Sequence, residues 1–178
     1  MSSAGPARAP GFEVVAPRRR SAGLPGSDVA GRNVYLYPGE VVASTEPRVI
    51  STILGSCVAV FMGDAVSRSG GANHFLLPRL ITGDGSSPRF GSVAMRVLEE
   101  KLLALGCEKR NLRAKVFGGA CQFDDPGGRV SIGQQNVLLA LRILEDEGIP
   151  VVAQETGGTR GRKVIFHTDT GDVWVKQL

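Results

Sequence analysis

The stretch Leu54-Gly55-Ser56-Cys57-Val58-Ala59-Val60 places a cysteine at the start of an apolar strand, directly after a Gly-Ser turn. A second apolar strand, in Gly70-Gly71-Ala72-Asn73-His74-Phe75-Leu76-Leu77-Pro78, carries a histidine. A cysteine nucleophile needs a base that takes up its proton and returns it. The chain has 2 histidines, and His74 is the one separated from Cys57 by a single strand and turn. The pair indicates a hydrolase that uses a cysteine nucleophile.

Outside this stretch, short β-rich segments alternate with two amphipathic helices. The first apolar stripe runs from Val93 to Leu105 and ends at Gly106, and the second runs from Val137 to Leu144. Strands are expected over 34–36, 48–52, 58–62, 73–77, 112–117 and 151–155, followed by a hairpin of 163–167 and 173–176. Mixed hairpins and helical crossovers predict an α/β layered fold with a mixed β-sheet and two main helices.

Composition sets the class of protein. The chain has 178 residues, with 42% hydrophobic and 21% charged residues, as expected for one globular domain with a complete core. No apolar run approaches the roughly 20 residues of a membrane span, so membrane insertion is not expected. Three cysteines without repeated spacing do not form a disulfide pattern, which favours a reducing compartment and a cytoplasmic location.

The first 31 residues differ from the rest of the chain. They are rich in Ala, Gly, Pro and Arg and show neither helical nor strand periodicity, which predicts a disordered basic tail over 1–31 and one domain over 32–178. Residues 1–32 hold five arginines, including the run Arg18-Arg19-Arg20, and two acidic residues, so they carry +3 of the net charge of +4. The remaining body is close to neutral, which argues against nucleic acid as a partner.

Cys57 has two interpretations on its sequence alone. Cysteine is often a buried packing residue, and that interpretation also suits Cys107 and Cys121. The turn before Cys57 offers a second one, because the backbone N–H groups of Ser56 and Cys57 can stabilise the oxyanion of a tetrahedral intermediate.

His74 is likewise either a hydrogen-bonded core histidine or a general base. Its apolar neighbours favour the neutral imidazole that a base requires, whereas His167 lies in the terminal hairpin and is expected to be more exposed. The sequence lacks the paired Cys and His spacings of a zinc site, and none of its glycine pairs matches a nucleotide-binding motif, so no metal or cofactor is expected.

Six blocks in order and spacing resemble the CheD family of chemoreceptor glutamine deamidases. They begin with Tyr37-Pro38-Gly39-Glu40 and the two stretches quoted above. They continue with Lys115-Val116-Phe117-Gly118-Gly119-Ala120, Ile132-Gly133-Gln134-Gln135-Asn136 and the run from Thr156 to Val164. The resemblance covers roughly residues 34–175 and implies an α/β architecture related to toxin deamidases.

The resemblance also implies a Cys-His-Thr catalytic set. Carried over by position, Cys57 is the nucleophile, His74 is the general base, and the third member falls six residues before the cysteine, on Ser51. Serine keeps the hydroxyl but lacks the methyl that restricts χ1. Thr52 is the alternative, although strand alternation would turn it to the opposite face from Ser51. Gln135 is a second departure, since the family commonly has arginine there.

The implied activity is deamidation of specific receptor glutamines to glutamate in chemotaxis adaptation, with release of ammonia and no cofactor. Partners would be the cytoplasmic helices of methyl-accepting chemoreceptors and a CheC-type phosphatase. A weakly catalytic regulatory module that binds the phosphatase or a receptor is the alternative. The residues expected to line the substrate cleft are Gly55, Gly71, Asn73, Gly118, Gly119 and Gly158.

Overall fold

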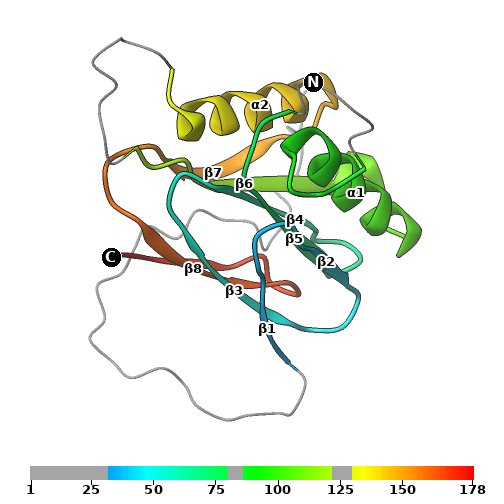
Figure 1. The fold of residues 1–178 in the computed structure, drawn as a ribbon. Helices are drawn as coiled ribbons and strands as arrows, with labels where there is room; N and C mark the ends of the chain where they lie inside the picture. Colours follow the sequence, from blue (N-terminus) through cyan, green and yellow to red (C-terminus); the bar gives the residue numbers. More distant parts are fainter. Residues whose placement is uncertain (1–31, 80–85, 122–129) are drawn as a thin grey trace, which may run out of the picture.

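The computed structural model describes residues 32–79, 86–121 and 130–178. The tail predicted over 1–31 lies outside the described residues. Two β-sheets and one helical layer stack on one another (Figure 1). This arrangement confirms the predicted α/β layered fold with mixed sheets and two main helices.

The first sheet has four strands in the order β1-β3-β8-β9 within the described part of the chain. Its strands are β1 (Asn33–Tyr35), β3 (Val49–Leu54), β8 (Arg162–His167) and β9 (Val173–Gln177). The β1–β3 pair is parallel and the other two pairs are antiparallel. The strand expected near residue 50 and the C-terminal hairpin are therefore present.

Among the residues that the structure describes, the second sheet has five strands in the order β2-β5-β4-β6-β7. They are β2 (Val41–Ser44), β4 (Val58–Asp64), β5 (Ser69–Phe75), β6 (Leu112–Gly118) and β7 (Val151–Thr156). Strand β2 was not expected from the sequence. Strand β5 also begins earlier than predicted, because Gly70 and Gly71 pair with Ser44 and Ala43 of β2 rather than forming a loop.

Two helices cover the outer face of the five-stranded sheet: α1 (Gly91–Ala104) and α2 (Ile132–Asp146). A short 3-10 helix, η1 (Lys109–Asn111), leads into β6. Ser131 caps the N-terminus of α2: its side chain accepts a hydrogen bond from the Gln134 N–H, while the Gln134 side chain accepts one from the Ser131 N–H. This capping box fixes the start of α2 beside the strands that carry the candidate site.

The core has two layers, one on each face of the five-stranded sheet. Alternate residues of β4 enter different layers: Val58, Val60 and Met62 face the helices, whereas Ala59 and Phe61 face the four-stranded sheet. Strand β4 is therefore buried on both faces, which explains its continuous apolar sequence.

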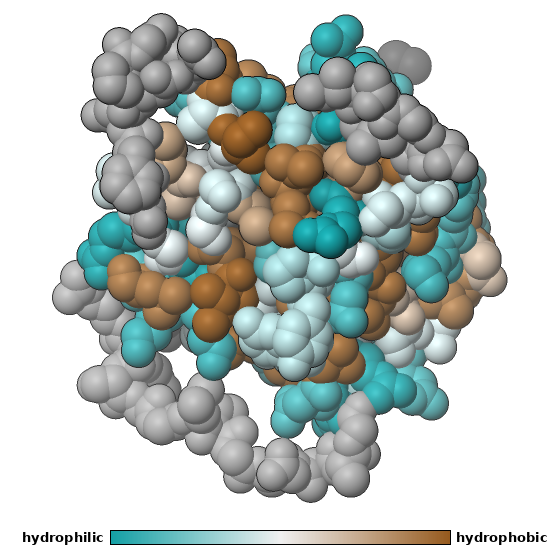
Figure 2. Space-filling view, viewed as in Figure 1, coloured by the Kyte–Doolittle hydropathy of each residue, from teal (hydrophilic) through white to brown (hydrophobic). Residues whose placement is uncertain are grey.

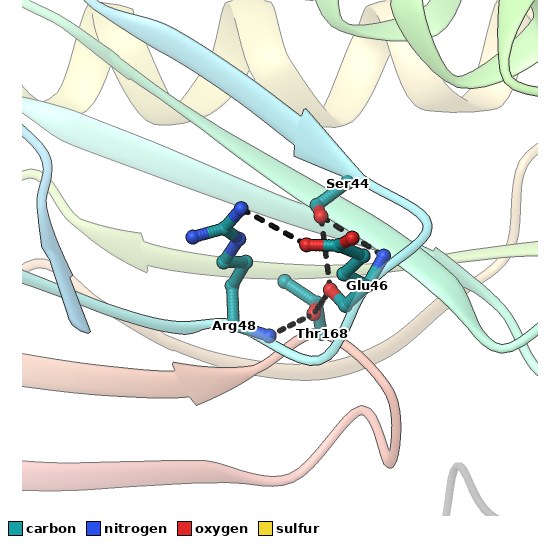
Figure 3. A network of polar contacts seen from close by, with 4 residues as sticks. All are labelled: Ser44, Glu46, Arg48 and Thr168. Carbon is teal, nitrogen blue, oxygen red and sulfur yellow. Dashed lines mark hydrogen bonds and ion pairs between the residues drawn. The ribbon is translucent and has the colours of Figure 1, made fainter. Parts of the chain in front are cut away.

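The two sheets are joined by a polar cluster at the turn between β2 and β3 (Figure 3). The Arg48 N–H donates to the Thr168 hydroxyl over 2.9 Å, and the Ser44 hydroxyl donates to the Glu46 carbonyl over 2.9 Å. Thr168, which follows β8, also donates its hydroxyl to the Glu46 carbonyl, so this cluster links the end of β2 in the five-stranded sheet to the four-stranded sheet. The opposite end of β3 leads into the turn that carries Cys57.

Candidate active site

Cys57 lies directly before β4, as the sequence predicts. Strand alternation places its side chain on the same face as Ala59 and Phe61, and it packs against the core layer between the two sheets. The side chain is partly exposed, unlike the fully buried residues that follow it. Cys57 therefore lies where the space between the sheets reaches the surface.

His74 lies in β5 directly opposite Ala59 of β4. Continuing this antiparallel register makes Cys57 the diagonal neighbour of His74 on the same face of the sheet. Diagonal neighbours have Cα atoms roughly 7–8 Å apart, within reach of longer side chains. The register of β4 and β5 thus brings the two predicted residues together.

The hydroxyl beside His74 belongs to Thr52, not to Ser51. Thr52 is fully buried, and its Oγ1 lies 2.9 Å from the Nδ1 of His74. Ile50, Thr52 and Leu54 face the five-stranded sheet, so Ser51 faces the other way. The expectation that Ser51 orients the imidazole is therefore wrong, and the alternative residue makes the contact.

Counting protons defines the tautomer of His74. The Thr52 hydroxyl donates its one proton to the Leu36 carbonyl over 2.8 Å, so it can only accept from His74. Nδ1 also lies 3.4 Å from the same carbonyl, where an N–H is favourable and a lone pair is not. Nδ1 therefore carries the proton in the neutral ring. Nε2 has the free lone pair, and it is buried without a hydrogen-bond partner among the described residues.

Burial shifts both candidate groups toward their neutral forms. It raises the pKa of the Cys57 thiol, although a hydrogen bond from the residue's own backbone N–H acts in the opposite direction. Burial also lowers the pKa of His74, against smaller opposing effects of the Leu36 carbonyl and the negative charge of Glu40. The resting pair is therefore a thiol beside a neutral imidazole.

Comparison with known proteins identifies the family of the chain. Residues 76–177, more than half of the chain, match the family model described as CheD chemotactic sensory transduction. The chain is 48% identical over 145 residues to a protein of Anaeromyxobacter dehalogenans named "Probable chemoreceptor glutamine deamidase CheD 1", covering 82% of this chain and 84% of that protein. The chain belongs to the CheD family.

Two other CheD proteins are similar to the chain in sequence over a comparable length. The "Probable chemoreceptor glutamine deamidase CheD" of Trichlorobacter lovleyi is 46% identical over 80% of this chain and 88% of its own length. The protein of the same name from Rhodospirillum rubrum is 44% identical, with 81% of each chain covered. These alignments extend over most of the folded body of this CheD chain.

Three of the six residues expected in the substrate cleft, Gly55, Gly118 and Gly119, lie at the Cys57 turn. The Gly119 N–H donates to the Cys57 carbonyl over 2.8 Å, and the Ala120 N–H donates to the Gly55 carbonyl over 2.8 Å. Gly118 has φ +110°, and an added Cβ would lie 2.2 Å from the Cys57 carbonyl oxygen. Gly158, exposed after β7, accepts a hydrogen bond from the Cys121 N–H.

The other two residues expected in the cleft lie elsewhere. Gly71 is buried in β5, where an added Cβ would lie 2.4 Å from the Val42 carbonyl oxygen. Asn73 is fully buried and faces the helices, with its Oδ1 accepting from the Val60 N–H and its Nδ2 near the Met95 sulfur. Strand alternation turns Asn73 away from the face that His74 occupies, so neither residue lines a cleft.

An open groove of about 370 Å³ is lined in part by Gly119, whose N–H donates to the Cys57 carbonyl. Its walls include Gly119, the end of β7 at Thr156, and the apolar side chains of Val130 and Leu138. Val130 is 51% exposed and Leu138 is 61% exposed, so the groove presents apolar surface to solvent. Hydrophobic residues reach the surface in the upper part of the view in Figure 2, where α2 lies in Figure 1.

Cys107 and Gln135, which the sequence also singled out, make contacts within the core and within the start of α2. Cys107 is buried in the core layer beneath the helices, in agreement with a packing role. The Gln135 side chain donates to the Val130 carbonyl over 2.8 Å, within the start of α2. Across the described ranges, no three His, Cys, Asp or Glu side chains are grouped closely enough to hold a metal ion. Neither helix in those ranges has the length and apolar character needed to cross a bilayer.

Proposed function

We propose that this CheD protein hydrolyses the side-chain amides of chemoreceptor glutamines, with Cys57 as nucleophile and His74 as general base. The hydrogen-bond pattern of His74 is the observation that carries the proposal. Thr52 and Leu36 hold the proton on Nδ1, which leaves the Nε2 lone pair to accept the thiol proton. The names of the aligned relatives support the same reaction.

The first half of the reaction forms a thioester. His74 Nε2 takes the proton of Cys57, and the sulfur attacks the carboxamide carbon of glutamine. Backbone N–H groups of Ser56 and Cys57 stabilise the oxyanion that develops on the carboxamide oxygen. The carbon–nitrogen bond then breaks, and the nitrogen leaves as ammonia with the proton from His74.

The second half regenerates the enzyme. Water gives a proton to His74 and attacks the thioester carbon, the carbon–sulfur bond breaks, and the proton returns to Cys57. The net reaction consumes one glutamine and one water and yields one glutamate and one ammonia. All protons are exchanged between Cys57, His74 and water, so the chemistry needs no cofactor.

The proposed substrates are the cytoplasmic helices of methyl-accepting chemoreceptors, and the proposed location is the cytoplasm. The apolar groove that includes Gly119 supports a helical substrate, because an amphipathic helix can lay its apolar face into such a groove. A glutamine on the edge of that helix would then lie next to the partly exposed thiol. A CheC-type phosphatase is a further proposed partner of this surface.

The decisive experiment is deamidation of a purified receptor cytoplasmic fragment, followed by mass spectrometry of its glutamine-containing peptides. The wild-type chain should convert specific glutamines to glutamate with release of ammonia, and Cys57→Ala should abolish conversion. Cys107→Ala and Cys121→Ala are matched controls that should retain it. Binding of the fragment without conversion by the wild-type chain would instead support the regulatory-module alternative.

A further inference from the structure

Asn136 is a fully buried polar residue in the first turns of α2. It lies on the apolar stripe that continues through Ala140 and Leu144, both of which belong to the core beneath the helices. Its Oδ1 is buried without a hydrogen-bond partner among the described residues. An unsatisfied buried acceptor destabilises a fold, so packing alone does not account for an amide at this position.

The donors of Asn136 connect the two strands of the candidate site. Its Nδ2 donates to the Leu76 carbonyl over 2.8 Å and to the Ser56 carbonyl over 3.1 Å. Leu76 follows His74 by two residues, and Ser56 directly precedes Cys57. One amide group on α2 therefore holds the backbone next to the nucleophile and the backbone next to the base.

The bond to Ser56 also determines where the Cys57 N–H points. The Ser56–Cys57 peptide is trans, so its carbonyl and N–H point in opposite directions from one plane. Asn136 draws the carbonyl toward α2, and the N–H is consequently directed away from α2. The Cys57 carbonyl is fixed separately by the Gly119 N–H over 2.8 Å. The carbonyls of Ser56 and Cys57 are thus both held. The Cys57 N–H contacts its own thiol in the resting state, and a substrate oxygen would take over this donor when the sulfur attacks.

We propose that Asn136 is a positioning residue that aims the Cys57 N–H at the oxyanion formed during attack on the glutamine carboxamide. This inference rests on the proposed function, because it requires Cys57 to be the nucleophile. Asn136 touches neither the substrate nor the sulfur in this role. It acts through the orientation of one peptide group, in which a small rotation moves the donor out of line with the oxyanion.

The test compares two reactions of the same thiol in Asn136→Leu, which removes both donors with little change in side-chain size. Deamidation forms an oxyanion, whereas alkylation of Cys57 by iodoacetamide does not. We expect kcat for the receptor fragment to fall about 10²-fold, with KM and the alkylation rate unchanged. Leu144→Ala, which removes a buried side chain of α2 farther along the helix, should lower the melting temperature and leave kcat of the folded protein unchanged.

Two outcomes of this comparison would overturn the inference. An unchanged kcat would show that the orientation does not matter, and an equal fall in kcat and alkylation rate would show that Asn136 only supports the local fold. Retained deamidation by Cys57→Ala is a different result, because it would refute the proposed nucleophile itself.

The wild-type chain provides a measurement that does not depend on the folding of a variant. A peptide carrying an aldehyde in place of the glutamine carboxamide forms a hemithioacetal with a cysteine thiol, and its oxygen occupies the position of the oxyanion. We expect the Cys57 amide proton to shift downfield in NMR spectra when this adduct forms. Absence of the shift in an adduct confirmed by mass spectrometry would contradict the proposed direction of the N–H.

Discussion

The Thr52 hydroxyl of one sheet lies 2.9 Å from the imidazole Nδ1 of His74 in the other. Thr52 is on β3 of the four-stranded sheet, and His74 is on β5 of the five-stranded sheet. The orientation of the proposed base therefore depends on how the two sheets pack. The contact is fully enclosed, which protects the hydrogen bond from competing water.

Replacing Thr52 by valine should lower deamidation without disrupting the core. Valine has nearly the shape of threonine but no hydroxyl, so His74 loses the acceptor that holds its proton on Nδ1. We expect kcat for a receptor fragment to fall about 10²-fold, as for other losses of alignment at a reacting centre.

Two variants serve as controls for this prediction. Thr52→Ser keeps the hydroxyl and should retain most of the activity, whereas Ser51→Ala should have no effect because Ser51 faces away from His74. Loss of activity in Ser51→Ala together with normal activity in Thr52→Val would contradict the observed face of β3.

Removal of the imidazole should be more severe. His74→Gln should reduce turnover by about 10²–10⁴-fold, since the proposed general acid and base is lost from both halves of the reaction. His167→Gln is the control and should remain close to the wild-type rate. Equal losses in the two variants would show that the effect is structural. Circular dichroism of both proteins would check that each is folded.

The pH dependence of thiol alkylation should report the neutral resting pair. Only the thiolate reacts with iodoacetamide, and burial raises the pKa of Cys57. The alkylation rate should therefore keep rising with pH above the range in which an ordinary cysteine thiol has already ionised. The measurement is the pseudo-first-order rate against pH, with Cys57→Ala used to subtract reaction at the other cysteines.

A plateau near neutral pH would contradict this prediction, because it would indicate a preformed thiolate and imidazolium.

The same resting state sets the acid limit of deamidation. The proposed base, His74, is neutral at pH values above its pKa, and burial lowers that pKa. Deamidation should therefore be lost only at pH values below the usual imidazole range.

Adding a methyl group at Gly118 should disturb the Cys57 turn. The new Cβ would lie 2.2 Å from the Cys57 carbonyl oxygen, and φ is +110°. Gly118→Ala should therefore lower both the melting temperature and kcat. Gly106→Ala is a matched control, because Gly106 has φ +91° but nothing within 4 Å of the added Cβ. It should lower stability by about 1 kcal/mol and leave kcat unchanged.

Comparable activity losses in these two glycine variants would show that backbone strain, rather than crowding at Cys57, is responsible. Differential scanning fluorimetry and steady-state kinetics on the same preparations would separate the two effects.

The sequence by itself predicted the class of fold and the pair of residues proposed as nucleophile and base. The apolar stripes beginning at Val93 and Val137 lie in α1 and α2, which begin one turn or so earlier than the stripes. Cys57 and His74 could be singled out because the turn and the strand that surround them are short segments, contiguous in the sequence. Asn136 had a weaker signal, as a polar residue on an otherwise apolar helical stripe, and no local feature related it to Ser56 or Leu76.

The tertiary structure decided which face of β3 is buried against His74. Both faces of this strand carry apolar residues: Ile50 and Leu54 lie on the face of Thr52, and Val49 and Ile53 lie on the face of Ser51. Hydrophobic pattern alone therefore cannot choose between the two hydroxyls. The choice comes from the pairing of β3 with β8 and from the packing of the sheet they form on β4 and β5. Those contacts join residues far apart in the chain, so the sequence of β3 alone does not show which face they bury.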